Sequence, residues 1–186
     1  IWIAENLKVT HYRNGDSIPN ITDNDDWANT EDGAYCNYDN DENNVKTYGR
    51  LYNWFSVNDK RGLAPKGWHI PTDEEWDELV DYLGGDKKAG DKLKSRGTIE
   101  YETGLWEERN KGATNESGFT VLPGGERIGN TGVYTNMGLN GVFWSSTDKT
   151  SIPMRAFYRT LSYMKSEVLR YPNIKKYGYS VRCIRD

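Results

Sequence analysis

The sequence has no long hydrophobic run and no excess of positive charge. A membrane-spanning helix needs about 18 or more consecutive apolar residues, and no such run occurs in the 186 residues. Lysine and arginine together number 24 against 28 aspartates and glutamates, which gives a formal net charge of −4. Nucleic-acid binding depends on clustered positive charge. We therefore expect neither a membrane span in this chain nor a nucleic-acid partner.

Histidine is also scarce, and this shortage argues against catalysis. The two histidines, His11 and His69, have no partner at the spacing of a metal site or of an activated nucleophile. His69 lies between Trp68 and a helix cap, where a structural hydrogen-bonding role is the simpler interpretation. Adjacent acids such as Asp25-Asp26 are typical of solvated surfaces. We predict that the protein is not an enzyme and has no cofactor.

Only two cysteines occur, Cys36 and Cys183, near opposite ends of the chain. A disulfide between them would close a loop of almost the whole sequence and stabilise the fold by about 5 kcal/mol in the chain-entropy model. The irregular, secreted-looking composition favours this disulfide. Two inert buried thiols are the alternative.

What the sequence does have is aromatic side chains and glycine. Aromatics make up 13% of the residues, with 7 Trp and 13 Tyr, and there are 19 glycines. The mean hydropathy is only −0.88. These values predict a small aromatic core wrapped in many turns, because glycine supplies the positive φ that turns need. The length favours one domain over residues 1–186.

The clearest local pattern is a helix that begins after Thr72. Thr72 and Glu75 have the spacing of a capping box, and Gly84-Gly85 provides a stop. Between these signals, four apolar side chains form one stripe at helical spacing. They are Trp76, Leu79, Val80 and Leu83.

The other elements are predicted from weaker patterns. A second helix is expected over residues 48–55, where apolar side chains recur at i, i+3, i+4 and i+7. Residues 1–9 are strand-like, and residues 15–44 have the composition of a loop. Beyond residue 90 the helical patterns fade, and short strands are predicted at 118–122, 142–146, 154–162 and 179–184. This order indicates an α+β fold whose first and last strands can pair and hold the chain ends together.

Six ordered segments carry a resemblance to a known family. They lie at residues 2–7, 48–54, 67–72, 118–125, 143–147 and 179–186, and they include Trp68-His69-Ile70-Pro71-Thr72 and Phe143-Trp144-Ser145-Ser146-Thr147. Together they resemble, from end to end, the Fibrobacter succinogenes-type major paralogous domain, a family of bacterial surface and secreted proteins.

The resemblance implies a C-type-lectin-like fold, with two helices packed on a small twisted, mostly antiparallel sheet and with long loops. Related folds occur in formylglycine-generating enzymes and in the variable proteins of retroelement systems. It also implies export to the cell surface, as a secreted or lipoprotein-anchored protein, with this chain a piece of a larger one. No activity is implied. The enzymatic relatives use a reactive cysteine pair late in the fold, whereas Cys36 lies early.

Calcium is the one metal for which the acidic loops offer ligands. Asp39, Asp41 and Glu42 are weak candidates for a structural calcium ion. They lack the spacing of the twelve-residue calcium loop. The Glu-Pro-Asn and Gln-Pro-Asp triplets of calcium-dependent lectins do not occur, so sugar binding through calcium is not predicted.

Tyrosine and asparagine in the late loops form the predicted binding surface. Four tryptophans are assigned to the core: Trp54, Trp68, Trp76 and Trp144. Tyr177 and other tyrosines lie instead among polar residues, where tyrosine gives contact area at low entropic cost; pinning of the loops is an equally weighted alternative. By analogy with the retroelement-type relatives, the site falls within residues 130–140, 148–153 and 163–175. The candidate residues are Tyr134, Asn136, Asn140, Asp148, Tyr163, Arg170, Tyr171 and Asn173.

These observations predict an extracellular or cell-surface module that binds a protein, peptide or polysaccharide. A structural or adhesin-assembly module without a small ligand is the alternative. An enzyme of the formylglycine-generating type is the least favoured class.

Overall fold

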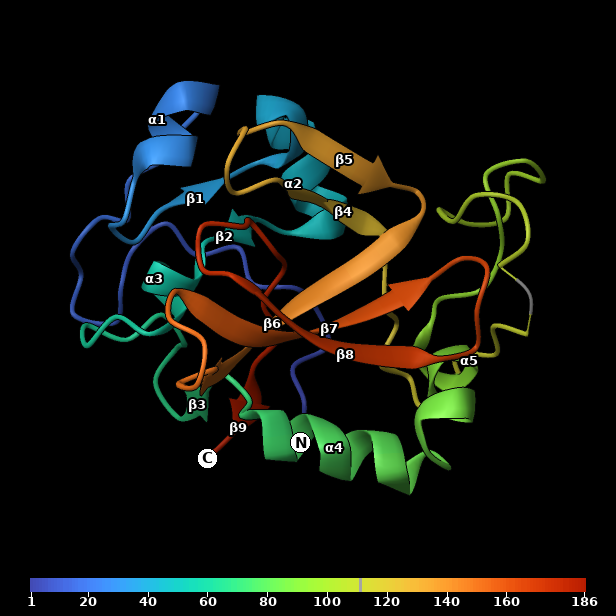
Figure 1. The fold of residues 1–186 in the computed structure, drawn as a ribbon. Coiled ribbons are helices and arrows are strands. Elements are labelled where there is room, and N and C mark those ends of the chain that lie inside the picture. Colours follow the sequence, from blue (N-terminus) through green and yellow to red (C-terminus); the bar gives the residue numbers. More distant parts are fainter. Residues whose placement is uncertain (111) are drawn as a thin grey trace.

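The computed structural model describes residues 1–110 and 112–186, and it has the α+β architecture that the sequence predicts (Figure 1). The helices of the described residues are α1 (Asn24–Asn29), α2 (Glu42–Tyr48), α3 (Trp54–Val57), α4 (Asp73–Tyr82) and α5 (Asp86–Leu93), with a 3-10 helix at Tyr38–Asn40. The strands are β1 (Tyr35–Cys36), β2 (Leu51–Tyr52), β3 (Trp68–His69), β4 (Gly124–Arg127), β5 (Tyr134–Met137), β6 (Asn140–Asp148), β7 (Arg155–Ser162), β8 (Val168–Ile174) and β9 (Ile184–Arg185).

The strands form small antiparallel sheets, of which the largest has the order β6-β7-β8. Three pairs complete the set: β1 with β2, β3 with β9, and β4 with β5. In Figure 1 the three-stranded sheet crosses the middle of the molecule, with α4 below it and the β4–β5 hairpin above. Strands β6 and β7 confirm the strands predicted at 142–146 and 154–162.

Helix α4 confirms the prediction made from its local signals. The Thr72 hydroxyl accepts from the backbone of Glu75, and the Glu75 carboxylate accepts from the backbone of Thr72, so both halves of the capping box are present. Trp76 and Val80 face the core. The left-handed Gly84 and Gly85, at φ 104° and 88°, follow the last turn.

The helix predicted over residues 48–55 is wrong, and Gly49 gives the physical reason. This glycine ends α2 with φ 76°, and a Cβ at this position would lie 2.7 Å from the Cβ of Asn6. The chain turns there, pairs β2 with β1, and starts α3 only where the Asn53 side chain caps it. The apolar residues at 48–55 are therefore divided among the end of α2, strand β2 and the start of α3, and no continuous helix forms.

Several elements were not predicted. Helix α1, strand β1 and the 3-10 helix lie in the segment 15–44 that was predicted as a loop, and β5 lies in the predicted loop 130–140. Helix α5 and strand β8 were not predicted either. The polar sequence of α5 hides a narrow buried stripe of Ala89, Gly90 and Leu93, and a Cβ on Gly90 would lie 2.6 Å from the carbonyl oxygen of Ser166. Strand β8 lies within the predicted loop 163–175. It contains Pro172, which an edge strand tolerates because one side of it makes no ladder hydrogen bonds.

The two ends of the chain lie together, as expected, although residues 1–9 form no regular strand. The backbone of Arg185 donates to Ile1, that of Ile3 to Cys183 and that of Leu7 to Val181; in Figure 1 the N and C labels are close to each other. The strand predicted at 179–184 is also mostly irregular: it forms isolated β-bridges and ends in the short β9. The segment predicted as a strand at 118–122 forms only one isolated β-bridge, between Val121 and Lys94.

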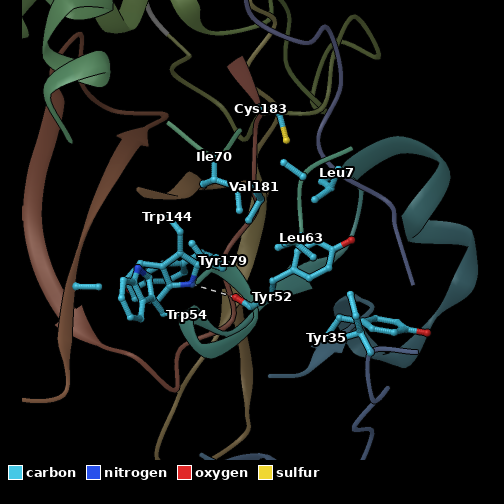
Figure 2. Close-up of a cluster of buried hydrophobic side chains, with 14 of the residues drawn as sticks. Leu7, Tyr35, Tyr52, Trp54, Leu63, Ile70, Trp144, Tyr179, Val181 and Cys183 are labelled. Atoms are coloured by element: carbon cyan, nitrogen blue, oxygen red, sulfur yellow. Dashed lines mark hydrogen bonds between the residues drawn. The ribbon is translucent and has the colours of Figure 1, made fainter. Parts of the chain in front are cut away.

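Aromatic side chains fill the core. Trp54, Trp76 and Trp144 are buried, as predicted, while Trp68 is half-buried. Figure 2 shows Trp144 beside Tyr179, with the Trp144 indole donating to the Tyr52 carbonyl at 3.0 Å. No helix of the described residues is long and apolar enough to cross a membrane.

The predicted disulfide is wrong. Cys36 and Cys183 are both free and buried, and they belong to different hydrophobic clusters. Burial raises the pKa of the Cys36 thiol to about 11 and that of the Cys183 thiol to about 12. The alternative holds: each thiol packs as a small apolar group.

Both thiols are expected to be unreactive in the folded protein, because the thiolate is the reactive species and burial disfavours it. A chromogenic disulfide reagent at neutral pH should detect no thiol in the native protein and both thiols after unfolding in guanidinium. Mobility on reducing and non-reducing gels should be equal. A chain that runs faster without reductant, and shows no thiols when unfolded, would restore the disulfide.

Candidate functional site

The eight residues predicted to form the site are dispersed by the sheet. Three of them, Asn136, Tyr171 and Asn173, come together with side chains that the sequence did not suggest. The other five lie elsewhere, most of them engaged in contacts within the protein. The first group defines the candidate site, and it begins with a row of aromatic rings across β6, β7 and β8.

This row consists of Trp144, Tyr158 and Tyr171, which are cross-strand partners. The ring centroids are 6.2 Å apart between Trp144 and Tyr158 and 6.3 Å apart between Tyr158 and Tyr171. Exposure grows along the row: Trp144 is buried, Tyr158 is half-buried and Tyr171 is 49% exposed. Cross-strand aromatic pairs stabilise sheets, and here they also lead from the core to the surface.

Two more tyrosines join the row from the segment after β8. Tyr179 is fully buried, with its ring 4.9 Å from Tyr158 and 4.4 Å from Trp144, and it forms the base of the group. The half-buried Tyr177 lies 5.6 Å from Tyr179. Asn173 shares a strand face with Tyr171 and donates to the Tyr179 hydroxyl at 2.6 Å.

The carboxyl group of Glu126, in β4, lies near Tyr158 and Tyr179 and contributes to the raised pKa of both. Asn136 has φ 64°, a conformation that asparagine tolerates better than most residues, and its side-chain amide donates to Glu126 at 2.7 Å. Burial raises the pKa of Glu126, and the Asn136 and Tyr179 side chains offset part of that shift. We call this surface the tyrosine face. It consists of Glu126, Asn136, Tyr158, Tyr171, Asn173, Tyr177 and Tyr179.

Two tyrosines of this face, Tyr158 and Tyr179, stay protonated at neutral pH. Burial, with a smaller contribution from the Glu126 charge, raises the pKa of Tyr158 to about 12 and that of Tyr179 well above its usual value. Glu126 is the carboxyl group of the tyrosine face, and burial raises its pKa. The face can offer aromatic rings, hydroxyl and amide hydrogen-bonding groups, and one carboxyl group.

Arg170 points to the opposite side of the sheet from Tyr171. Its guanidinium bonds the carboxylate of Asp73 and lies 4.1 Å from the Phe157 ring. Asp73, at the start of α4, also pairs with the buried Arg159 at 2.5 Å. These ion pairs attach the helix to the sheet, so Arg170 has a structural partner.

The remaining candidates also have partners or lie apart. The Tyr134 hydroxyl donates to Asn40 at 2.8 Å, and its ring lies over Arg127. Asp148 accepts from Lys175 at 2.8 Å. Tyr163 packs against a hydrophobic cluster beside a shallow hollow that Glu107, Glu108, Arg109 and Leu139 also line. Asn140 begins β6 opposite Ser162.

The acidic residues considered for calcium are used locally. Asp41 caps α2 and accepts from the backbone of Asn43 at 2.9 Å. Glu42 pairs with Arg50 at 2.9 Å. Asp39 lies in the 3-10 helix. Within the described part of the chain, no group of three or more His, Cys, Asp or Glu side chains is placed to hold a metal ion. Structural calcium stays a prediction.

His69 has the structural role that the sequence indicates. Its Nδ1 lies 2.8 Å from Asp186 and its Nε2 lies 2.8 Å from Glu75, so the ring joins the C-terminus to the cap of α4. Partial burial alone would lower the pKa of His69, but its bonds to Asp186 and Glu75 outweigh this and raise the pKa above its usual value.

A small α+β domain with a tyrosine-rich surface beside its central sheet is the class of protein that these features define. The chain belongs to the Fibrobacter succinogenes major domain family, whose model matches residues 1–185. This confirms the resemblance found in the sequence and gives the chain a bacterial origin. No curated protein and no solved structure matches the chain.

Sequence reasoning missed the most important group of the face, Glu126. It follows the Pro123-Gly124-Gly125 segment, and no local pattern distinguishes it from other surface acids. Only the hairpin register, which sets Glu126 opposite Thr135 and next to Asn136, brings it to the tyrosines. The alternation of residues 154–162 did predict that Tyr158 lies in a strand. Strand β8, which pairs with that strand and carries Tyr171, was not predicted.

Proposed function

We propose that this protein is an extracellular or cell-surface binding module with a C-type-lectin-like fold, and that it recognises its ligand through the tyrosine face. The ligand class is a protein, peptide or polysaccharide. The observation that carries the proposal is the aromatic row that runs from the buried Trp144 to the exposed Tyr171.

The composition of the face supports recognition. Tyrosine combines a large, rather rigid contact area with a hydroxyl, and it is enriched where proteins bind others. The rings are held in place from below, because Tyr179 packs on Trp144 and is bonded by Asn173. A surface that is ordered before it meets its ligand loses less entropy on binding.

The test is a screen of glycan and peptide arrays and bacterial surface fractions with the wild-type domain and with two double variants. Tyr158→Ala with Tyr171→Ala removes the outer rings of the face. Tyr82→Ala with Tyr101→Ala is the control, since these tyrosines are 86% and 69% exposed and lie in α4 and in the segment after α5. The affinity for any ligand found in the screen should fall roughly 30-fold or more in the variant that lacks Tyr158 and Tyr171, as expected for aromatic hot spots.

The control should bind like the wild type. Thermal unfolding of each variant checks that it is folded. The single variant Tyr171→Ala, at a half-exposed position, tests the same face with little loss of core packing. A ligand whose affinity is unchanged by both face variants would refute the placement of the site. Silence of the wild-type domain across the whole screen would favour the alternative, a structural or adhesin-assembly module.

A further inference from the structure

The aromatic clusters of this protein fall into two kinds. Most of them carry a lysine or arginine of the chain itself over a ring: Arg61 over Tyr12, Arg127 between Trp27 and Tyr134, Arg170 over Phe157, and Lys175 over Trp54. Arg182 lies in the same way beside Phe119. Within the described residues, no such cation lies over Tyr158, Tyr171, Tyr177 or Tyr179.

The carboxylate of the tyrosine face also has no positive partner in the described part of the chain. Among the described residues, no lysine, arginine or histidine forms a salt bridge with Glu126. Its neighbours are the neutral Asn136 amide and the neutral Tyr179 hydroxyl. A half-buried carboxylate without a counter-charge loses hydration that no ion pair replaces, and such a group at a surface is a candidate for ligand binding.

The nearby lysines and arginines are occupied elsewhere. Lys175 bonds Asp148, Lys176 bonds the Ala28 carbonyl, and Arg170 bonds Asp73 on the other side of the sheet. The face therefore resembles the protein's internal cation sites, which also combine rings with acceptor oxygens. The difference is that no described residue supplies the cation here.

We propose that the tyrosine face binds a cationic side chain of a partner protein or peptide, a lysine ammonium or an arginine guanidinium, with Glu126 as the counter-ion. This inference rests on the proposed function and names its ligand chemistry. The rings of Tyr158, Tyr171 and Tyr177 attract a cation through their negative π faces. The carboxylate adds a charge-assisted hydrogen bond.

The charge of the face separates this ligand from others. A phosphate or carboxylate ligand would meet Glu126 with no basic group of the face to offset it. A neutral sugar could stack on the rings but would leave the carboxylate without its counter-charge. The net charge of −4 further favours the approach of a positively charged partner at moderate salt.

The test uses three small probes: Nα-acetyl-lysine methylamide, Nα-acetyl-arginine methylamide and the neutral Nα-acetyl-norleucine methylamide. Saturation-transfer NMR with the whole domain should show binding of the lysine probe, the arginine probe or both, with dissociation constants on the order of millimolar. The norleucine probe, which has a similar apolar stem without the charge, should show none.

Glu126→Gln keeps the shape of the side chain and its hydrogen bond with Asn136 but removes the charge. It should lower the affinity for the cationic probe roughly tenfold. Glu78→Gln is the matched control: it makes the same charge change at an exposed position on α4 and should leave the affinity unchanged. The affinity should also fall as the pH drops through the raised pKa of Glu126, since only the ionised carboxylate pairs with the probe. Tyr158 and Tyr179, which sense the Glu126 charge, stay neutral over that range because burial raises their pKa values.

Equal binding of norleucine, unchanged affinity of Glu126→Gln, or no binding of either cation at about 20 mM would overturn this inference. The outcomes separate it from the proposed function. Array ligands lost with the tyrosine variants but retained by Glu126→Gln would leave the binding site in place and remove only the cationic ligand.

Discussion

Replacing Arg127 by Met is expected to lower the free energy of unfolding by about 4 kcal/mol, since each buried acceptor left without a donor costs about 1–3 kcal/mol. Arg127 is fully buried. Its guanidinium donates to five acceptors of two segments, all of them neutral: the carbonyls of Gly132, Ile21, Thr22 and Asp23 and the side chain of Asn24. The substitution leaves most of them unpaired, while the apolar stem is kept.

Rings enclose the same guanidinium. Trp27 and Tyr134 lie 4.6 Å and 4.7 Å from its central carbon, so the variant also loses two cation–π contacts. Arg127→Lys should recover little, because an ammonium has three donors and cannot reproduce the planar fork of arginine. The consequence is loosening of residues 20–24 and of the hairpin that carries Glu126.

The measurement is chemical and thermal unfolding, with a fall in melting temperature of about 8–16 °C for a domain of this size. Arg185→Met is the control. Arg185 is exposed in β9, and its side chain makes no hydrogen bond or ion pair to the described residues. If Arg127→Met were as stable as the control, the five acceptors would not depend on this residue. Arg127 would then not be what holds residues 20–24 against the hairpin.

Replacing Trp76 by Ala is expected to cost about 4 kcal/mol, as for other buried tryptophans. Trp76 is the centre of the second core cluster, with the Trp2 ring at 4.7 Å and the Phe119 and Phe143 rings at 5.7 Å and 5.6 Å. The loss of its volume leaves a cavity between α4, the N-terminal segment and β6. Dispersion contacts with three rings disappear together.

A comparison with Trp144 isolates the polar part of this effect. The Trp76 indole nitrogen is buried without a hydrogen-bond partner in the described chain, whereas that of Trp144 donates to the carbonyls of Tyr52 and Tyr177. Trp→Phe removes a similar volume at both sites, so Trp144→Phe should cost about 1 kcal/mol more. Equal losses in equilibrium unfolding would show that the bonds of Trp144 add no net stability.

The fold was predictable where the information is local. The capping box at Thr72 and the glycines at 84 and 85 specify α4 almost by themselves, because each signal acts within one turn of the helix. The strands β6 and β7 were predictable from their composition. The disposition of the chain ends also followed from strand-like residues at both termini.

The parts that failed depend on contacts between distant residues. Gly49 turns the chain because Asn6 lies against it, and α5 is held by a buried stripe only three residues wide. Cys36 and Cys183 lie in separate clusters, a fact that no spacing in the sequence reveals. The candidate site failed in the same way, because alternation in β8 sends Arg170 to α4 and Tyr171 to the opposite side.

The most direct test of the tyrosine face as a binding site is NMR of the wild-type domain with ring-labelled tyrosine, titrated with the lysine and arginine probes. Progressive shifts are expected at the rings of Tyr158, Tyr171, Tyr177 and Tyr179, whereas the Tyr82 and Tyr101 signals should stay unchanged. Shifts at Tyr82 or Tyr101 that equal or exceed those of the face, or unshifted face rings while a probe binds, would contradict the assignment of the tyrosine face as the binding site.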